Sequence, residues 1–267
     1  MLDLCTGSGC IPLLFQHEFY AKLDASRTEA AITLDLIGVD ISTHAIKLAR
    51  ENQAVQLKQT RLKAGTRSLQ AESLESMRFL RANVLHKGET GGSIAEASSL
   101  PQVLLGRDPA LQQVKTDILI SNPPYISSSD YWHKTAHSVR HYEPKLALVP
   151  PNTLHGQRTA QDGDDFYNHI FATAKDFDSK ICLVEVADLT QAKRVALMAT
   201  QQGIWDGVEI WRDDPTAQSP ETPDTLIHGQ GCSNCPIPIM GSGAGRSVIA
   251  YRWEGGEWVG RAAKRIR

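Results

Sequence analysis

The tetrapeptide Asn122-Pro123-Pro124-Tyr125 combines residue types that can bind a planar NH2 group. Proline lacks a backbone N–H and has a fixed φ, so this turn offers carbonyl acceptors and few donors. The side-chain oxygen of Asn122 adds one more acceptor. Such a turn can accept both hydrogens of an amide or amino group while the Tyr125 ring lies against the flat face of that group. An isolated Asn-Pro-Pro can also be an ordinary strand-ending turn.

A second chemical signal lies at the start of the chain. The segment Met1–Leu4, apolar apart from Asp3, predicts a strand that leads into Gly7-Ser8-Gly9 and then a helix from about Cys10. Two glycines permit a tight turn and let a ligand approach the backbone N–H groups closely. The third glycine of the dinucleotide fingerprint is replaced by Pro12, which argues against a nicotinamide oxidoreductase.

Two polar residues follow the next predicted strands. Asp40 ends a strand predicted for residues 33–39, where a carboxylate can bind the two ribose hydroxyls of an adenosine cofactor. A helix-capping or turn role is the alternative for Asp40. Asn83 follows a strand at 78–81, and its carbonyl oxygen can meet an adenine amino group or serve as a turn residue.

Strands and helices alternate along the chain, which predicts an α/β fold with a mostly parallel sheet covered on both faces. Further strands are expected at 117–120, 181–187, 207–212 and 247–253, the last two as an antiparallel C-terminal hairpin. Helices are expected at 164–177 and after Asp188. We predict one catalytic domain over residues 1–267, with disordered insertions near 58–72, 86–106 and 213–245. In an open parallel sheet the glycine-rich loop and the Asn-Pro-Pro-Tyr turn should face one another across one cleft.

Together these motifs resemble the class I S-adenosylmethionine methyltransferases, and more narrowly the HemK/PrmC-type protein-(glutamine N5) methyltransferases. The Asn-Pro-Pro-Tyr motif is shared with adenine-N6 methyltransferases, whereas a Tyr-Glu-Pro-x-Leu-Ala-Leu segment is typical of the glutamine branch. The matching segments are Leu2–Gly9, Gly38–Ser42, Phe79–Leu85, Ser121–Ile126, Tyr142–Leu148, Asp162–Tyr167 and Gly245–Tyr251.

The resemblance implies a Rossmann-like seven-stranded sheet and methyl transfer from S-adenosyl-L-methionine. It implies as acceptor the side-chain amide nitrogen of glutamine in the Gly-Gly-Gln motif of a peptide-chain release factor. The residues expected to bind the cofactor are Asp3, Thr6, Gly7, Gly9, Asp40, Ile41, Asn83 and Asn122. The expected catalytic residues are Asn122, Pro123 and Tyr125. The expected substrate-binding residues are Asn122, Pro123, Pro124, Tyr125 and Glu143.

The chain departs from the family pattern in two places. Asn83 stands where the family usually has Asp, although Asn keeps an acceptor oxygen. The N-terminal helical domain of the family, which helps to recognise the release factor, is expected to be absent because Met1 already lies at the first strand. A truncated cofactor-binding remnant is therefore an alternative to an active enzyme.

Composition bears on the remaining alternatives. The 267 residues carry a net charge of −2, without the basic excess that is typical of an enzyme acting on DNA or RNA, so we expect no direct nucleic-acid binding. His133, His137 and His141, and the pair Cys232 and Cys235, lack a full ligand set, so no metal is expected. No apolar run is long enough to cross a membrane. Members of this branch act in bacteria and organelles, so a mitochondrial location is suspected, and otherwise a cytoplasmic one.

Overall fold

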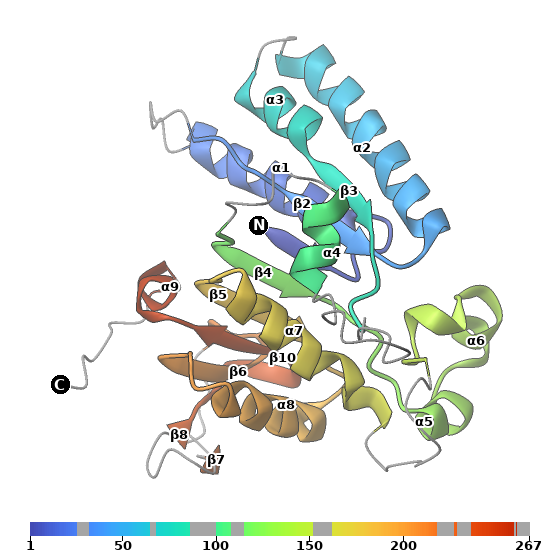
Figure 1. Cartoon of the computed structure of the whole chain (residues 1–267), viewed down its shortest axis with the longest axis vertical. Coiled ribbons are helices and arrows are strands. Elements are labelled where there is room, and N and C mark those ends of the chain that lie inside the picture. Colours follow the sequence, from blue (N-terminus) through green and yellow to red (C-terminus); the bar gives the residue numbers. More distant parts are fainter. Residues whose placement is uncertain are drawn as a thin grey trace, which may run out of the picture. The chain divides into compact units, whose positions relative to one another are not determined.

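The computed structural model describes residues 1–25, 32–64, 68–85, 100–107, 115–151, 162–217, 227–228, 236–258 and 260. The chain divides into two compact units, Met1–Val114 and Lys115–Arg267, whose elements are labelled in Figure 1.

Unit 1 contains three parallel strands in the order β3-β2-β1. Leu2 pairs with Ile37, and Ile37 pairs with Arg78. The strands are β1 (Leu2–Leu4), β2 (Ile37–Asp40) and β3 (Arg78–Arg81), and the helices are α1 (Cys10–Ala25), α2 (Thr43–Ala64), α3 (Leu69–Ser76) and α4 (Leu100–Arg107).

Helices α1, α2 and α3 enclose an apolar core with β3. Its buried members are Leu13, Leu36, Ile46, Ala49, Leu74, Met77 and Phe79. Two glutamines of α2 tie this core together: Gln53 donates to the carbonyls of Leu74 and Met77, and Gln56 donates to the carbonyl of Leu13. The two bonds from Gln53 satisfy backbone carbonyls at the C-terminal end of α3 and at its C-cap, Met77.

Gly9 lets the start of α1 approach β3 closely. Its φ is +76°, and a Cβ atom added there would lie 2.8 Å from the Phe79 ring and 3.0 Å from the Cβ of Ala49. Gly7 also has a positive φ, of +55°, but a Cβ there would meet nothing within 4 Å. Gly9 is therefore required by both packing and conformation, and Gly7 by conformation alone.

Unit 2 has a mixed sheet in the order β4-β5-β10-β6-β9. β4 runs parallel to β5, whereas β10 is antiparallel to both β5 and β6. The strands of this sheet are β4 (Ile118–Ser121), β5 (Ile181–Glu185), β6 (Gly207–Asp214), β9 (Ile239–Met240) and β10 (Ser242–Tyr251). A separate two-stranded sheet pairs β7 (Ile227–His228) with β8 (Pro236–Ile237). The helices are α5 (Ser128–His133), α6 (His137–Tyr142), α7 (Asp165–Asp176), α8 (Leu189–Gln201) and α9 (Trp253–Trp258), with 3-10 turns η2 (Lys145–Ala147) and η3 (Asp162–Asp164).

Helices α7 and α8 show the local signals that the sequence predicts. Asp188 is the N-cap of α8, and its carboxylate accepts a hydrogen bond from the Gln191 backbone N–H. The apolar side of each helix is buried. The buried residues include Phe166, Tyr167, Ile170, Phe171 and Ala174 of α7, and Ala192, Val195, Ala196 and Ala199 of α8.

The expected α/β class is confirmed, as is the antiparallel pairing of the strands at 207–214 and 242–251. The sequence predicts seven strands, whereas unit 1 contributes three strands and the larger sheet of unit 2 contributes five. The prediction misses β9, which has only two residues and therefore gives no sequence signal. Strand β2 begins at Ile37 rather than near residue 33.

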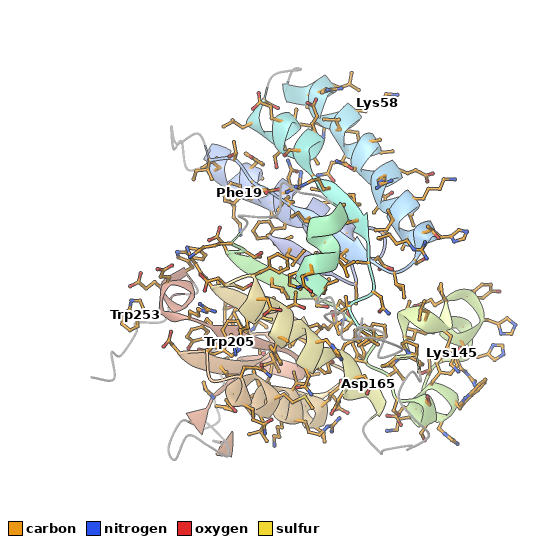
Figure 2. All side chains as sticks on the ribbon, in the orientation of Figure 1. Phe19, Lys58, Lys145, Asp165, Trp205 and Trp253 are labelled. Atoms are coloured by element: carbon orange, nitrogen blue, oxygen red, sulfur yellow. The ribbon has the colours of Figure 1, made fainter. Side chains whose placement is uncertain are left out.

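The predicted disordered insertions are wrong wherever the structure describes them. Residues 58–64, including Lys58 in Figure 2, continue α2, and α3 begins at Leu69. Residues 58–64 are mostly polar, but most of them are good helix formers, and no glycine or proline occurs before Gly65. Residues 100–106 lie in α4, and parts of 213–245 form β6, β7, β8, β9 and β10. Residues 65–67, 86–99, 218–226 and 229–235 lie outside the described part of the chain. Among the helices described, none is both long and apolar enough to cross a membrane.

Gly9→Ala should destabilise the chain more than Gly7→Ala does. The new Cβ at position 9 overlaps the Phe79 ring and also meets the positive-φ penalty, so we expect a loss of about 2 kcal/mol or more in the free energy of unfolding. Gly7→Ala meets the conformational penalty alone, about 1 kcal/mol. Urea unfolding followed by circular dichroism measures both, and equal losses would contradict the packing role of Gly9.

Candidate functional site

The loop after β1, which we call the glycine loop (residues 5–9), is closed by backbone hydrogen bonds. The N–H of Thr6 donates to the carbonyl of Val39 at 2.9 Å, and the N–H of Gly9 donates to the carbonyl of Thr6 at 2.9 Å. Asn52 of α2 donates from its side chain to the carbonyl of Ser8 at 3.0 Å. Cys5 has a φ of +61°, a strained value for a residue with a side chain. The loop is thus held from β2 and α2.

Asp40 joins this loop to the start of α2. Its Oδ2 accepts from the N–H of Gly7 at 2.9 Å, and its Oδ1 accepts from the N–H of Ser42 at 2.8 Å. Each carboxylate oxygen can accept a further hydrogen bond. The turn role and the ligand-binding role considered for Asp40 are therefore compatible.

Asp3 is a buried carboxyl group beside the same loop. Its side chain is fully buried, and within the described chain neither its oxygens nor the Thr6 hydroxyl have a hydrogen-bond partner. Burial raises the pKa of Asp3 from 3.8 to about 7, and the Asp40 charge adds to this rise; the nearby Thr6 hydroxyl opposes it, although it lies outside ordinary hydrogen-bonding geometry. A buried acid without a partner suits a cationic or hydrogen-bonding ligand.

Two further expected cofactor residues of unit 1, Ile41 and Asn83, lie near Asp40. Ile41 is an exposed apolar side chain directly after it. Asn83 follows β3, where the Ala82 N–H donates to the Asp40 carbonyl at 3.0 Å. The Asn83 side-chain oxygen accepts from the N–H of Leu85 at 3.0 Å, so it forms a turn whatever else it binds.

In unit 2, the acceptor turn (Asn122-Pro123-Pro124-Tyr125) directly follows β4. Ser121, the last residue of β4, pairs with Val184 of β5. Asn122 is exposed, whereas the two prolines are buried. The chain beyond the turn is held by a 2.9 Å bond from the N–H of Ile126 to the carbonyl of Leu148. An exposed amide side chain thus stands on a rigid, buried base.

Tyr125 is held at its hydroxyl, which donates to Oε1 of Glu185 at 3.1 Å. Burial and the charge of Glu185 raise the pKa of Tyr125 to about 12. The phenol therefore stays protonated at neutral pH and acts as a hydrogen-bond donor. It is poorly suited to accept a proton, so the ring itself is the surface that Tyr125 can offer to a planar group.

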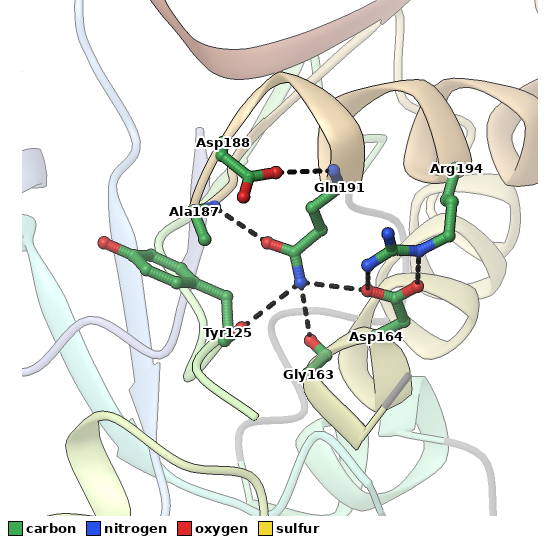
Figure 3. A network of polar contacts seen from close by, with 7 residues as sticks. All are labelled: Tyr125, Gly163, Asp164, Ala187, Asp188, Gln191 and Arg194. Atoms are coloured by element: carbon green, nitrogen blue, oxygen red, sulfur yellow. Dashed lines mark hydrogen bonds and ion pairs between the residues drawn. The ribbon is translucent and has the colours of Figure 1, made fainter. Parts of the chain in front are cut away.

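A buried polar network lies behind the acceptor turn (Figure 3). The side-chain amide of Gln191 donates to the carbonyls of Tyr125 and Gly163, each at 3.2 Å. It also donates to Oδ1 of Asp164 at 2.9 Å. Neither Gln191 nor Glu185 is among the site residues predicted from the sequence; the isolated carboxylate of Glu185 in an apolar strand is the signal that could have indicated a role.

Glu143 is exposed and follows α6, in a segment that leads to the 3-10 turn η2. Its charge contributes to the raised pKa of Tyr125, which associates it with the acceptor turn. The structure therefore gathers the expected residues into two groups, one around the glycine loop in unit 1 and one around the acceptor turn in unit 2.

The histidines beyond the turn do not share one helix. His133 ends α5, whereas His137 and His141 stack on α6 with ring centroids 4.6 Å apart. In the part of the chain that the structure describes, no three His, Cys, Asp or Glu residues form a metal-binding group. Cys232 and Cys235 lie outside the described residues.

Replacement of Asp3 by Asn should change how stability depends on pH. Between about pH 4 and pH 7 the folded chain keeps a proton on Asp3 that the unfolded chain has released, so stability falls as the pH rises through this window. Asp3→Asn removes this loss and should be more stable than the parent at about pH 8, by up to about 4 kcal/mol, but not at about pH 4. Urea unfolding at both pH values measures this, with the exposed Asp176→Asn as control. A parallel pH dependence in parent and Asp3→Asn would show that Asp3 is ionised in the fold.

Comparison with known proteins gives no match to a family model but several to curated proteins. The chain is 30% identical over 204 residues to a protein of Schizosaccharomyces pombe named probable MRF1 mitochondrial N(5)-glutamine methyltransferase mtq1, covering 73% of this chain and 50% of that protein. It is 31% identical over 151 residues to the release factor glutamine methyltransferase of Chlorobaculum tepidum, covering 57% and 35%. It is 27% identical over 190 residues to the ribosomal protein uL3 glutamine methyltransferase of Francisella tularensis, covering 70% and 41%.

Among solved structures, the hMettl16 catalytic domain in complex with MAT2A 3'UTR hairpin 1 matches with a TM-score of 0.45 and 13% identity, over 94% of this chain and 63% of that one. The chain spans half or less of the length of the three curated relatives described above. All three carry the name of a glutamine methyltransferase, as the motifs predict. The chain is a relative of the release factor N5-glutamine methyltransferases.

Proposed function

We propose that this chain transfers a methyl group from S-adenosyl-L-methionine to the side-chain amide nitrogen of a glutamine in the Gly-Gly-Gln motif of a peptide-chain release factor. The observation that carries the proposal is the acceptor turn: an exposed Asn122 on two buried prolines, next to a Tyr125 whose hydroxyl is already bonded. This turn can accept hydrogen bonds from an NH2 group and has few donors with which to repel one. Relatives named as release factor glutamine methyltransferases supply the substrate class.

The residues of unit 1 fit the proposed cofactor. Asp40 keeps acceptor capacity for two ribose hydroxyls, and Ile41 offers an exposed apolar surface for the adenine ring. Asp3, buried beside the glycine loop, would support the loop where it meets the methionine part of the cofactor. Thr6, Gly7, Gly9 and Asn83 would complete this site.

The chemistry explains why the turn offers acceptors and why no general base is needed. The cofactor supplies a methyl group on a sulfonium sulfur, a strong electrophile. An amide nitrogen is a weak nucleophile because its lone pair is shared with the carbonyl, so it must be oriented toward that methyl carbon. Hydrogen bonds from the NH2 to the Asn122 oxygen and the Pro123 carbonyl strengthen as positive charge grows on nitrogen. The nitrogen–carbon bond forms, the carbon–sulfur electron pair returns to sulfur, and one N–H proton leaves to water.

Pro124, Tyr125 and Glu143 would complete the acceptor side. Tyr125 would cover one face of the amide, and Glu143 would contact the peptide beside the glutamine. We propose that both groups of residues act in one catalytic domain over residues 1–267. The relative from Schizosaccharomyces pombe is named as mitochondrial, so we also propose a mitochondrial location.

A glutamine in ribosomal protein uL3 is a second candidate acceptor. The observation that favours it is the name of the relative from Francisella tularensis. The same turn chemistry serves either protein, because the reacting group is a glutamine amide in both.

Asn122→Ala should lower kcat by about a hundredfold or more, because it removes an acceptor that strengthens in the transition state. The assay incubates the chain with cofactor and a Gly-Gly-Gln release factor or uL3, and detects the added methyl group by mass spectrometry. Asn168→Ala, which removes another exposed asparagine of unit 2, is the matched control. Methylation of neither protein by the parent would refute the proposed function, and equal rates for the two variants would refute the role of Asn122.

Asp40→Ala should weaken S-adenosylmethionine binding by about ten- to a hundredfold, because two hydrogen bonds to a charged acceptor are lost. Isothermal titration calorimetry gives the Kd. Asp35→Ala removes an exposed carboxylate that pairs with Arg78 and should leave the Kd unchanged. An unchanged Kd in Asp40→Ala would contradict the proposed contact between Asp40 and the ribose.

A further inference from the structure

We infer that Gln191 is a positioning residue for methyl transfer: its side-chain amide sets the place of the Tyr125 carbonyl and thereby orders the acceptor turn. This inference rests on the proposed function of the turn. Gln191 lies on α8, 66 residues from Tyr125 in sequence, and is 4% exposed.

The orientation of the Gln191 amide is fixed by what surrounds it (Figure 3). Its nitrogen faces three acceptors: the carbonyls of Tyr125 and Gly163 and the carboxylate of Asp164. Its oxygen accepts from the N–H of Ala187 at 2.7 Å. A flipped amide would put oxygen against three acceptors and nitrogen against a donor, so only one orientation satisfies the site.

Arg194 holds the carboxylate that completes this arrangement. Its Nε and Nη2 bond Asp164 at 2.6 and 3.0 Å, a two-point contact that fixes the carboxylate plane. Asp164 is 6% exposed, so its charge would be costly without this partner. The network thus runs from Arg194 through Asp164 and Gln191 to the acceptor turn.

Gly163 shows that the fit around the Tyr125 carbonyl is close. A Cβ added at Gly163 would lie 2.3 Å from that carbonyl oxygen, so any larger residue would displace it. The opposite end of Tyr125 is held by Glu185 through the hydroxyl. With both ends held, neither the ring nor the peptide plane of Tyr125 can turn freely, and Pro123 and Pro124 transmit this order to Asn122.

The charge pattern allows a sharp test. Gln191→Glu has almost the same shape and keeps the acceptor for Ala187, but an ionised carboxylate would face three acceptors and repel them. Burial and the Asp164 charge raise the pKa of this new carboxyl, so it is ionised at about pH 9, whereas at lower pH it is protonated and keeps one donor. Gln191→Leu removes the donor at every pH. Gln201→Ala, at the exposed end of the same helix, is the control.

Two measurements on the full chain decide the question. Hydrogen exchange at the Ile126 amide reports the order of the turn without any substrate, and should be faster in both Gln191 variants than in Gln201→Ala. When the acceptor is a protein that the parent chain methylates, kcat should be about ten- to a hundredfold lower in the two Gln191 variants than in the parent. The Kd of these variants for S-adenosylmethionine should change less than about twofold. The rate of Gln191→Glu should recover as the pH falls, and that of Gln191→Leu should not.

Failure of the inference is distinct from failure of the proposed function. If the parent chain methylates no acceptor protein, the proposed function fails, and exchange at Ile126 alone decides whether Gln191 orders the turn. If Gln191→Glu at about pH 9 matches Gln201→Ala in both exchange and kcat, the positioning role is wrong. Gln191→Glu decides this even where Gln191→Leu does not fold, because at low pH it keeps the shape and a donor of the parent side chain.

Discussion

The structure around the acceptor turn depends on how a segment with few donors is held in place. Two prolines leave the turn unable to form a backbone hydrogen-bond ladder of its own. The bonds that hold it come from elsewhere: a donor from Gln191 to the Tyr125 carbonyl, an acceptor from Glu185 to the Tyr125 hydroxyl, and the carbonyl of Leu148 to the Ile126 amide. Because these contacts hold the side of the turn that faces the protein, the exposed amide of Asn122 remains available for a ligand.

The glycine loop shows the complementary arrangement. There the backbone offers N–H donors, and a carboxylate supplies the acceptors. Asp40 binds the N–H groups of Gly7 and Ser42, so one side chain sets the distance between the loop and the start of α2. A residue that only bound a ligand could be replaced without cost to the loop, whereas Asp40 serves both purposes.

Much of the fold follows from local signals. The N-cap at Asp188, the buried face of α7 and the strand at 78–81 are set by residues within a few positions of one another, and the structure has them where the sequence predicts them. The error at 58–72 has a physical cause as well. Helix propensity depends on backbone and rotamer freedom rather than on polarity, so a polar run of Lys, Gln and Arg continued α2. Short strands such as β9 depend on their neighbours and carry no periodic signal.

The sequence by itself determined which groups can donate, accept or bend: the donor-poor turn at Asn122, the glycines of the loop and the carboxylate after β2. These are covalent properties of residues close together in the chain, and they were enough to indicate the family. Only the tertiary structure decided that Asp3 is buried without a partner and that Gln191 and Glu185 hold Tyr125. Burial and long-range contacts arise from packing between distant segments. They set the pKa of the Asp3 carboxyl and the orientation of the Gln191 side-chain amide. No pattern of neighbouring residues encodes them.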